Sequence, residues 1–514
     1  MTARSLLEDR RTVWIVAAII ILLFATSNLP WQLDDYDQAK QAFTSLQMIK
    51  EGRWLYQQTP HEHVATKPPL VGWVSVGLFR LTQSWELSWR LPSFLAALAL
   101  AAVLFGAAKS AYGRTAALVA ISAFGLNLLS PRLATLVRTD LPLALMIFFI
   151  GLLIWQKIRD QTGWTLRDQT CAFALLTVAM LIKGPMVYAF LLPGIALFQW
   201  RGRAPPPDAP FQSAWPGWWP WLASLAVFLL WVLGGIFLQP DFFNEVVIRE
   251  FVGRFGETIH RPQPLYFYLP HLLHKFAPWS VLMLATVITT LGARKWQLRS
   301  AFREISPDTF WLLCWSLGGL IAMSLIPSKR VDRIFPVIPP LCLLLAAQIG
   351  RPSCSHGSAS RSSTRTEFEL TGHRPVATGD AAMNLYRWTA VALLLSILFT
   401  GGYTTWKVVT GYRHHQNALV VFGKDVRREM EAHHWHYEVV SAKDEGLLLY
   451  LRKTHFTEPD VAIAEWNRGN LDALVASTEK APSLMRQLRA PVLSQVKSAE
   501  RIEEQGRGYV LITR

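Results

Sequence analysis

Acidic and basic side chains beside long apolar runs are the residues that could perform chemistry in this sequence. Asp34 and Asp35 open a polar stretch, and Asp140 directly precedes an apolar run. A carboxylate at such a place can take a proton from a hydroxyl group as general base. Lys67 and Lys183 also lie beside apolar runs, and an ammonium group stabilises the charge that develops on a phosphate leaving group. These residue types suit transfer of a group from a phosphorylated donor.

Each of these residues also has a structural explanation. A carboxylate at a helix N-terminus is favoured by the helix dipole, so Asp34 could serve only as a helix cap. Asp140 could form a salt bridge with Arg138 or Arg132. Lys67 stands before two prolines, which end an extended segment and can start a helix. The surrounding elements are needed to choose between the two explanations.

The composition is that of a polytopic membrane protein. Of 514 residues, 51% are hydrophobic and only 17% are charged, against about 25% charged residues in soluble domains. This excludes a disordered chain and a small disulfide-stapled secreted domain. Since about 20 apolar residues span a bilayer, we expect about eleven spans. They lie at 13–29, 90–109, 115–131, 139–157, 170–183, 185–200, 219–238, 269–292, 309–327, 334–350 and 386–406.

The net charge of +15 has a topological explanation. In a soluble protein it would suggest nucleic acid, but in a membrane protein it reflects basic cytoplasmic loops, so no nucleic-acid partner is expected. The first span follows Arg10 and Arg11, which places the N-terminus in the cytoplasm and the long loop 30–89 outside it. The Ser-rich insert 351–385 is predicted to be a disordered cytoplasmic loop. The basic residues left on the outer side either snorkel beside lipid phosphates or hold an anionic substrate.

Two segments outside the spans are predicted to be structured. Within the outer loop, the apolar residues Ala39, Phe43 and Leu46 recur at helical spacing, which predicts an amphipathic helix along the membrane surface. Residues 411–514 hold 15 Lys and Arg against 14 Asp and Glu and are typical of a soluble domain. Strands are predicted there at 418–422, 437–441, 471–476 and 509–512, with helices at 425–433 and 445–452.

The predicted fold class is therefore all-α and polytopic, with a small soluble α/β domain at the C-terminus. Residues 1–410 would form the membrane domain, with its outer loop at 30–89. Residues 411–514 would form the extracytoplasmic domain.

Seven motifs occur in an order that is more specific than any of them alone. They are LDDYDQAKQAFTSLQMIKEGRWL, ATKPPLVGW, WRLPSFLAAL, VRTDLPLALM, LIKGP, RPQPLYFYLP and SKRVDRIFPVIPPLCLLLA. Over residues 10–350 the chain thereby resembles the membrane glycosyltransferases of the GT-C fold. The resemblance is greatest to the bacterial aminoarabinose lipid A transferases, which are distant relatives of the protein O-mannosyltransferases.

The resemblance implies a reaction and a set of site residues. Such enzymes transfer a sugar, here with inversion, from a polyprenyl-phosphate donor to an acceptor outside the cytoplasm, which would be lipid A, an envelope glycan or a protein. The chain would then lie in the bacterial inner membrane with its active site on the outer side. Asp34 matches the catalytic acid, Asp35 is its neighbour, and Asp140 matches the second acid. The implied phosphate-binding residues are Lys67, Lys183, Arg254, Arg261, Lys329 and Arg333.

The chain departs from the family's pattern at several places, and two of them bear on a metal site. Thr66 stands where the family often has Glu, and Arg249-Glu250-Phe251 stands where it often has Glu-Glu-His. The missing Glu and His argue against a divalent-metal site, and no cofactor is assigned.

Two other classes of protein stay open. A lipid-linked sugar transporter or flippase would place polar sites at the membrane midplane, often with inverted repeats. A non-catalytic lipid-binding protein of envelope assembly would have acids that point to separate surfaces, whereas an enzyme would have Asp34 and Asp140 lining one cavity.

Overall fold

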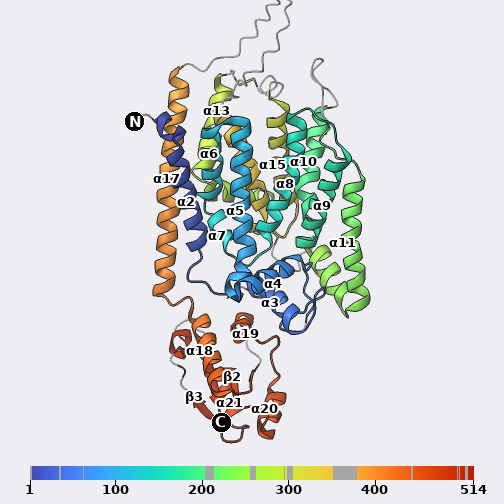
Figure 1. Ribbon diagram of the computed structural model, residues 1–514, viewed down its shortest axis with the longest axis vertical. Coiled ribbons are helices and arrows are strands. Elements are labelled where there is room, and N and C mark those ends of the chain that lie inside the picture. The colour runs from blue at the N-terminus through green and yellow to red at the C-terminus, as the bar shows by residue number, and fades with distance from the viewer. Residues whose placement is uncertain are drawn as a thin grey trace, which may run out of the picture.

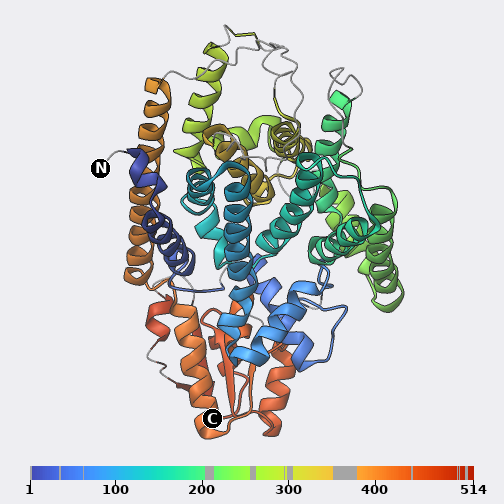
Figure 2. The same ribbon diagram turned by 45° about the horizontal axis from the view of Figure 1, so that its top comes forward.

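A helical bundle and a four-stranded sheet make up the two main parts of the molecule (Figure 1). The computed structural model describes residues 3–33, 36–61, 63–202, 213–254, 262–293, 296–297, 305–350, 379–440, 444–494, 496, 498–503 and 508–514. Helices α3 (Tyr36–Lys50) and α4 (Leu70–Thr82) lie between the bundle and the sheet (Figure 2). The N-terminal helices α1 (Ala3–Glu8) and α2 (Arg10–Thr26) pack against the long helix α17 (Gly379–Arg413).

The bundle is held together by large buried aromatic side chains and by close contacts between small residues. Trp155, Trp311 and Trp315 are fully buried. A Cβ atom on Gly318 would lie 2.3 Å from the backbone nitrogen of Gly194, so these glycines allow close helix approach, as in membrane interfaces. The bundle helices are α5 (Trp85–Tyr112), α6 (Arg114–Gly125), α7 (Ser130–Ala134), α8 (Asp140–Arg159), α9 (Leu166–Lys183), α10 (Met186–Gly202), α11 (Trp219–Leu238), α12 (Tyr268–Lys275), α13 (Trp279–Ala293), α15 (Pro307–Leu325) and α16 (Ile338–Ile349), with a π-helix at Phe243–Phe251 and 3-10 turns at Val252–Arg254, Leu265–Phe267 and Val331–Val337.

Helix length and hydropathy make the chain a multi-pass membrane protein. Among the described residues, six helical stretches are long and apolar enough to cross a bilayer: α5, α8, α11, α15, Val331–Ile349 and Asn384–Arg413. The pair Leu265–Lys275 and Trp279–Gly292 is a further candidate, but it is bent by 102°. The expected count of about eleven spans is not confirmed. The reason is length, since α2 has 17 residues and α6 ends at Gly125 after 12.

Two local expectations differ from the structure. Residues 418–422 were expected as a strand but form the first turns of α18 (Ala418–His433), so that prediction is wrong. Leu419, Phe422 and Val426 are buried at helical spacing along α18, and a short apolar run does not distinguish this pattern from a strand. The last part of the insert 351–385 is helical, because α17 begins at Gly379, and 351–378 lie outside the described residues.

The amphipathic helix predicted in the outer loop is α3, but its apolar face does not lie on the membrane surface. Ala42, Phe43 and Leu46 are buried in one cluster with Trp89 of α5. The same cluster contains Leu447 and other residues of the C-terminal part of the chain. The apolar face of α3 therefore packs against protein, and α3 shares a core with residues of the C-terminal part of the chain.

The C-terminal part is a mixed sheet covered by helices on both faces. Its strand order is β1-β2-β4-β3, where β1 (Tyr437–Val439) runs parallel to β2 (Ala473–Ser477), and β4 (Tyr509–Thr513) is antiparallel to both β2 and β3 (Val492–Ser494). Successive residues of β2 enter different cores, since Ala473 and Val475 face α18 while Leu474 and Ala476 face the other side. The remaining helices are α19 (Glu445–Leu451), α20 (Pro459–Arg468), α21 (Ala481–Met485) and α22 (Ala499–Glu503).

Candidate functional site

The end of the bundle that faces α3 holds a buried ion pair between two of the predicted site residues. Asp140 is the first residue of α8, and Lys183 is the last residue of α9. The Lys183 Nζ atom lies 2.5 Å from Oδ1 of Asp140. The alternative partners Arg138 and Arg132 form ion pairs with Asp332, and the charge of Arg138 also interacts with that of Asp140. Because α8 starts and α9 ends at this level, the two antiparallel helices place opposite charges side by side.

Lys67 is the second cation of this site. It precedes Pro68 and Pro69, which lead into α4, and its charge interacts with those of Asp140, Lys183 and Asp37. Burial and the neighbouring cation Lys183 lower the pKa of Lys67 to about 8. A cation held in this way among like charges gains stability when an anion binds beside it, so the position suits a phosphate group.

Asp37 at the start of α3 joins the outer loop to the bundle. Its carboxylate accepts a hydrogen bond from Arg330 and lies 4.0 Å from Nη2 of Arg138. Arg138 in turn donates to Oδ2 of Asp332 at 2.8 Å. Burial opposes ionisation of Asp37, but Lys67, Arg330 and Arg138 outweigh it and hold the pKa of this carboxyl at about 2. A carboxylate this acidic is a weak base, so Asp37 orders the cations around it.

Asp37, Arg138, Arg330 and Asp332 had no predicted role in the site. A signal for them was present, since each lies within five residues of a predicted site residue in the motifs. Their pairing was not visible because the partners are up to 293 residues apart.

The other predicted residues are placed as follows. Lys329 is buried and donates to the backbone oxygen of Gln263 at 2.9 Å. Arg333 donates to the backbone oxygen of Ser328 at 2.8 Å. Lys329 therefore binds the segment that precedes α12, and Arg333 binds the segment that precedes the 3-10 helix Val331–Val337. Asp34, Asp35, Arg261 and the side chain of Arg254 lie outside the described residues.

The two segments that carry the departures from the family pattern meet in space. The Thr66 hydroxyl donates to Oε1 of Glu250 at 2.9 Å. His63 lies nearby on the same loop, 3.6 Å from Oε1 of Glu245. Within the part of the chain that the structure describes, no three His, Cys, Asp or Glu side chains are arranged to hold a metal ion. The loop that carries His63 and Thr66 therefore meets the π-helix Phe243–Phe251 through a hydrogen bond and an ion pair.

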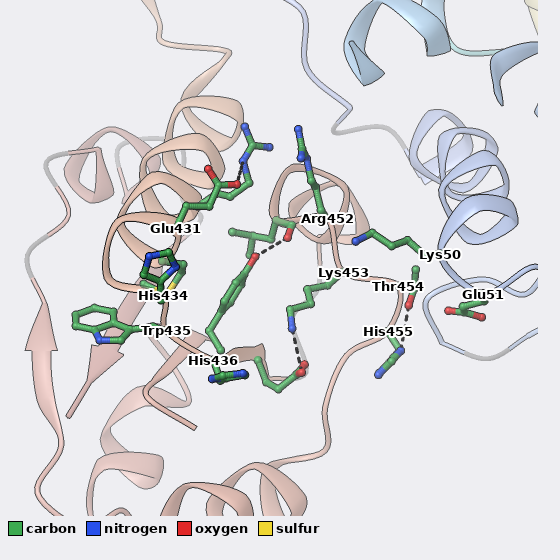
Figure 3. A pocket seen from close by; sticks show the side chains of 15 residues that line it. Lys50, Glu51, Glu431, His434, Trp435, His436, Arg452, Lys453, Thr454 and His455 are labelled. Atoms are coloured by element: carbon green, nitrogen blue, oxygen red, sulfur yellow. Dashed lines mark hydrogen bonds and ion pairs between the residues drawn. The ribbon is translucent and has the colours of Figure 1, made fainter. Parts of the chain in front are cut away.

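A separate pocket lies between the far end of α3 and the C-terminal domain. It has a volume of about 780 Å³ and is lined by basic side chains that include Lys50, Arg452 and Lys453 (Figure 3). Lys50 ends α3 and Arg452 caps α19, and cations are favoured at helix C-termini. Since α3 is 15 residues long, the pocket is about 20 Å from Asp37 along the helix axis. It contains none of the predicted site residues.

The class of protein follows from this arrangement. The molecule is a multi-pass helical bundle, and its charged site lies at the end of the bundle that carries the small α/β domain. Over 97% of both chains, the structure superposes with a TM-score of 0.67 on the crystal structure of ArnT from Cupriavidus metallidurans bound to undecaprenyl phosphate, at 18% sequence identity. This similarity shows the GT-C fold. The predicted fold class is confirmed to that extent.

Sequence comparisons give the particular group that the chain resembles. Residues 66–233 match the family model described as dolichyl-phosphate-mannose-protein mannosyltransferase. The undecaprenyl phosphate-alpha-4-amino-4-deoxy-L-arabinose arabinosyl transferase of Shewanella sediminis is 26% identical over 65% of this chain and 59% of its own length. The corresponding transferase 1 of Sodalis glossinidius is 34% identical over 24% of this chain and 21% of its own length.

The predicted resemblance to the aminoarabinose and protein mannosyl transferases is thus confirmed. The chain spans less than two thirds of the length of these curated relatives.

Proposed function

We propose that this protein is a membrane glycosyltransferase that moves a sugar from a polyprenyl-phosphate donor to an acceptor outside the cytoplasm. The observation that carries the proposal is the convergence of Lys67, Lys183 and Asp140 at one end of the bundle. Opposite charges brought together from three elements suit a reaction with a phosphate leaving group and a hydroxyl nucleophile.

The cations stabilise the departing phosphate. When the bond between the sugar's anomeric carbon and the donor phosphate breaks, negative charge develops on the polyprenyl phosphate. Lys67 and Lys183 lie where they can hold that charge, and Asp140 keeps the Lys183 ammonium group in place at 2.5 Å. Such preorganised charges lower the barrier because they need not reorient during the reaction.

An acid in the outer loop takes the proton. We assign Asp34, with Asp35 beside it, as the general base that removes the proton from the acceptor hydroxyl, while Asp140 orients the site. The acceptor oxygen attacks the anomeric carbon from the face opposite the phosphate, so the configuration inverts. Arg254, Arg261, Lys329 and Arg333 are proposed to extend the phosphate-binding surface.

The names of the relatives supply the first substrates to test. Both relatives described above are named for 4-amino-4-deoxy-L-arabinose carried on undecaprenyl phosphate, which supports that class of donor. We propose lipid A, an envelope glycan or a protein as acceptor. The departures at Thr66, Arg249 and Phe251 make a different sugar head group worth including among the donors.

We further propose an arrangement in the membrane. About eleven spans over residues 1–410 would place the charged site and the domain 411–514 on the outer side of the bacterial inner membrane. Support comes from the eleven apolar runs, each of which contains helix in the structure, and from the basic loops of the other face.

The test is a transfer assay with purified protein in lipid nanodiscs. Undecaprenyl-phosphate sugars are supplied with a lipid A acceptor, and mass spectrometry measures both the glycosylated acceptor and the released undecaprenyl phosphate. We expect Asp34→Asn to abolish both products, while Asp160→Asn, which changes an exposed carboxylate at the opposite end of α8, leaves them unchanged. Wild-type turnover by Asp34→Asn would refute the role of Asp34. Translocation of an intact donor without cleavage would support a transporter instead.

A further inference from the structure

The described part of the segment between α2 and α3, residues 27–33, is held at both of its ends by the last quarter of the chain. At its start, Lys407 of α17 donates to the backbone oxygen of Ser27 at 3.0 Å. At its end, the backbone N–H of Leu33 donates to the Tyr450 hydroxyl at 2.7 Å, in a buried position. The segment therefore cannot move freely between the bundle and the C-terminal domain.

Gln32 forms a second hydrogen bond to the C-terminal domain. Its side-chain oxygen accepts from the backbone N–H of Leu419 at 3.1 Å. Leu419 lies in the first turn of α18, where backbone N–H groups have no partner within the helix. The outer loop thus caps a helix of the C-terminal domain, and loss of the contact would leave a helix end unsatisfied.

The contact with α19 is close enough to exclude a side chain. A Cβ atom on Gly446 would lie 2.0 Å from the backbone oxygen of Leu33. Around it, Leu33, Phe43 and Leu447 are buried in a common cluster. Close packing of this kind transmits small displacements, because a dense core has no room to absorb them.

We propose that α18 and α19 act as a positioning clamp on the outer loop, with Tyr450 as its positioning residue. The clamp fixes the residues that lead into α3, and the start of α3 carries Asp37, which binds Arg330 and interacts with Lys67. The C-terminal domain therefore sets how the outer loop meets the charged end of the bundle. The inference rests on the proposed function for its effect on catalysis, but the clamp itself is a structural claim.

The clamp predicts a specific kinetic signature. Tyr450→Phe removes the hydrogen bond to Leu33 and keeps the buried ring, so the loop shifts while the domain stays folded. Because small displacements of reacting groups are costly, we expect kcat to fall about tenfold. The KM for the undecaprenyl-phosphate donor should stay within about twofold, since Lys183 ends α9 and Lys67 follows α3 in the chain, whereas the clamp holds the segment before α3.

The matched control is Tyr437→Phe. The Tyr437 hydroxyl likewise forms a hydrogen bond with the backbone, but it donates to the oxygen of Leu451 at 2.6 Å, within the C-terminal domain. We expect wild-type kcat and KM from this variant. Gly446→Ala should reproduce the kcat loss of Tyr450→Phe, because its methyl group would press on Leu33.

Hydrogen–deuterium exchange tests the clamp without any assay of transfer. In the full-length protein, Tyr450→Phe should speed exchange in peptides covering Trp31–Leu33 and the first turns of α3, whereas Tyr437→Phe should not. Unchanged exchange in Tyr450→Phe would overturn the proposal, as would equal effects of the two tyrosine variants. If exchange rises while the wild-type protein transfers no sugar, the proposed function fails and the clamp stands.

Discussion

The charged site around Asp140 and the pocket beside Lys453 are both rich in basic and acidic side chains, yet their charges have different origins. In the pocket, Lys453 pairs with Glu438 15 residues away, and Arg427 with Glu431 four residues away. In the site, Asp140 pairs with Lys183 at a separation of 43 residues. Local pairs follow from neighbouring helix ends and strands, whereas distant pairs require the bundle to bring them together.

The two regions also differ in how deeply their charges are buried. In the pocket, Lys50 and Arg452 stand at the C-terminal ends of α3 and α19, where the helix dipole favours cations. In the site, Asp140 at the start of α8 and Lys183 at the end of α9 also stand at favoured helix ends, but they are largely buried, and burying two charges costs about as much as their attraction returns. A buried pair of this kind therefore points to function more strongly than a basic surface does.

Removing one carboxylate from each region tests this difference most directly. Asp140→Asn should lower kcat/KM for the donor about a thousandfold, because Lys183 loses the group that holds it and the site loses an orienting acid. Glu438→Gln, its counterpart in the pocket, should leave kcat/KM unchanged. Steady-state transfer assays on variants with wild-type melting temperatures provide the measurement. Equal losses in both variants would remove the distinction between the regions.

The stability of the protein should depend on pH through Glu445, which lies at the junction between α3 and the C-terminal domain. This residue of α19 is buried, and burial raises its pKa to about 7 despite the opposing charge of Lys40. A carboxyl whose pKa is raised by folding stabilises the fold below its ordinary pKa of 4.5 and loses that contribution as pH rises through 7. Since each pKa unit corresponds to about 1.4 kcal/mol, Glu445→Gln should stabilise the protein by about 3 kcal/mol at pH 8.

Thermal unfolding of the Glu445→Gln variant and the wild type at several pH values checks this. The difference should shrink steadily below pH 7 and vanish near pH 4. Asp472→Asn, at a more exposed carboxylate of the same domain, serves as the control. A difference that does not change with pH would show that Glu445 is not ionised in the folded protein at pH 8.

Loss of the Lys67 charge should lower the transfer activity at high pH. Burial and Lys183 lower its pKa to about 8, so the ammonium charge is present below that pH and lost above it. We expect kcat/KM for the donor to fall about tenfold per pH unit above pH 8. In the Lys67→Arg variant this decline of kcat/KM should begin at a higher pH, because a guanidinium group keeps its charge. A pH profile that is the same in both proteins would place the titrating group elsewhere.

The smallest expected effect concerns the backbone conformation of Arg452, which lines the pocket. Arg452 adopts a φ of 57° where α19 ends, a conformation that glycine takes with less strain. Arg452→Gly should therefore raise the free energy of unfolding by about 0.5 kcal/mol and leave transfer unchanged. Chemical denaturation and the transfer assay measure the two quantities. Lost transfer in this variant would instead make the pocket part of the reaction.

The sequence by itself determined the class of fold and the residues of the site that lie beside apolar runs. Asp140 and Lys183 could be found because a charge next to a long apolar stretch has few structural reasons to be there. The helix α3 and most strands of the C-terminal sheet could be found from their periodicity. These are local features, and the local sequence is enough to encode them.

Only the tertiary structure decided which charges meet and what the C-terminal domain touches. Arg330 and Asp37 lie 293 residues apart, and Leu33 and Tyr450 lie 417 residues apart. The apolar face of α3 has the same pattern whether it lies on a lipid surface or on α19, because both environments exclude water. Whether lipid or α19 covers this face depends on how the chain folds back after α17. The periodicity of α3 carries no information about that.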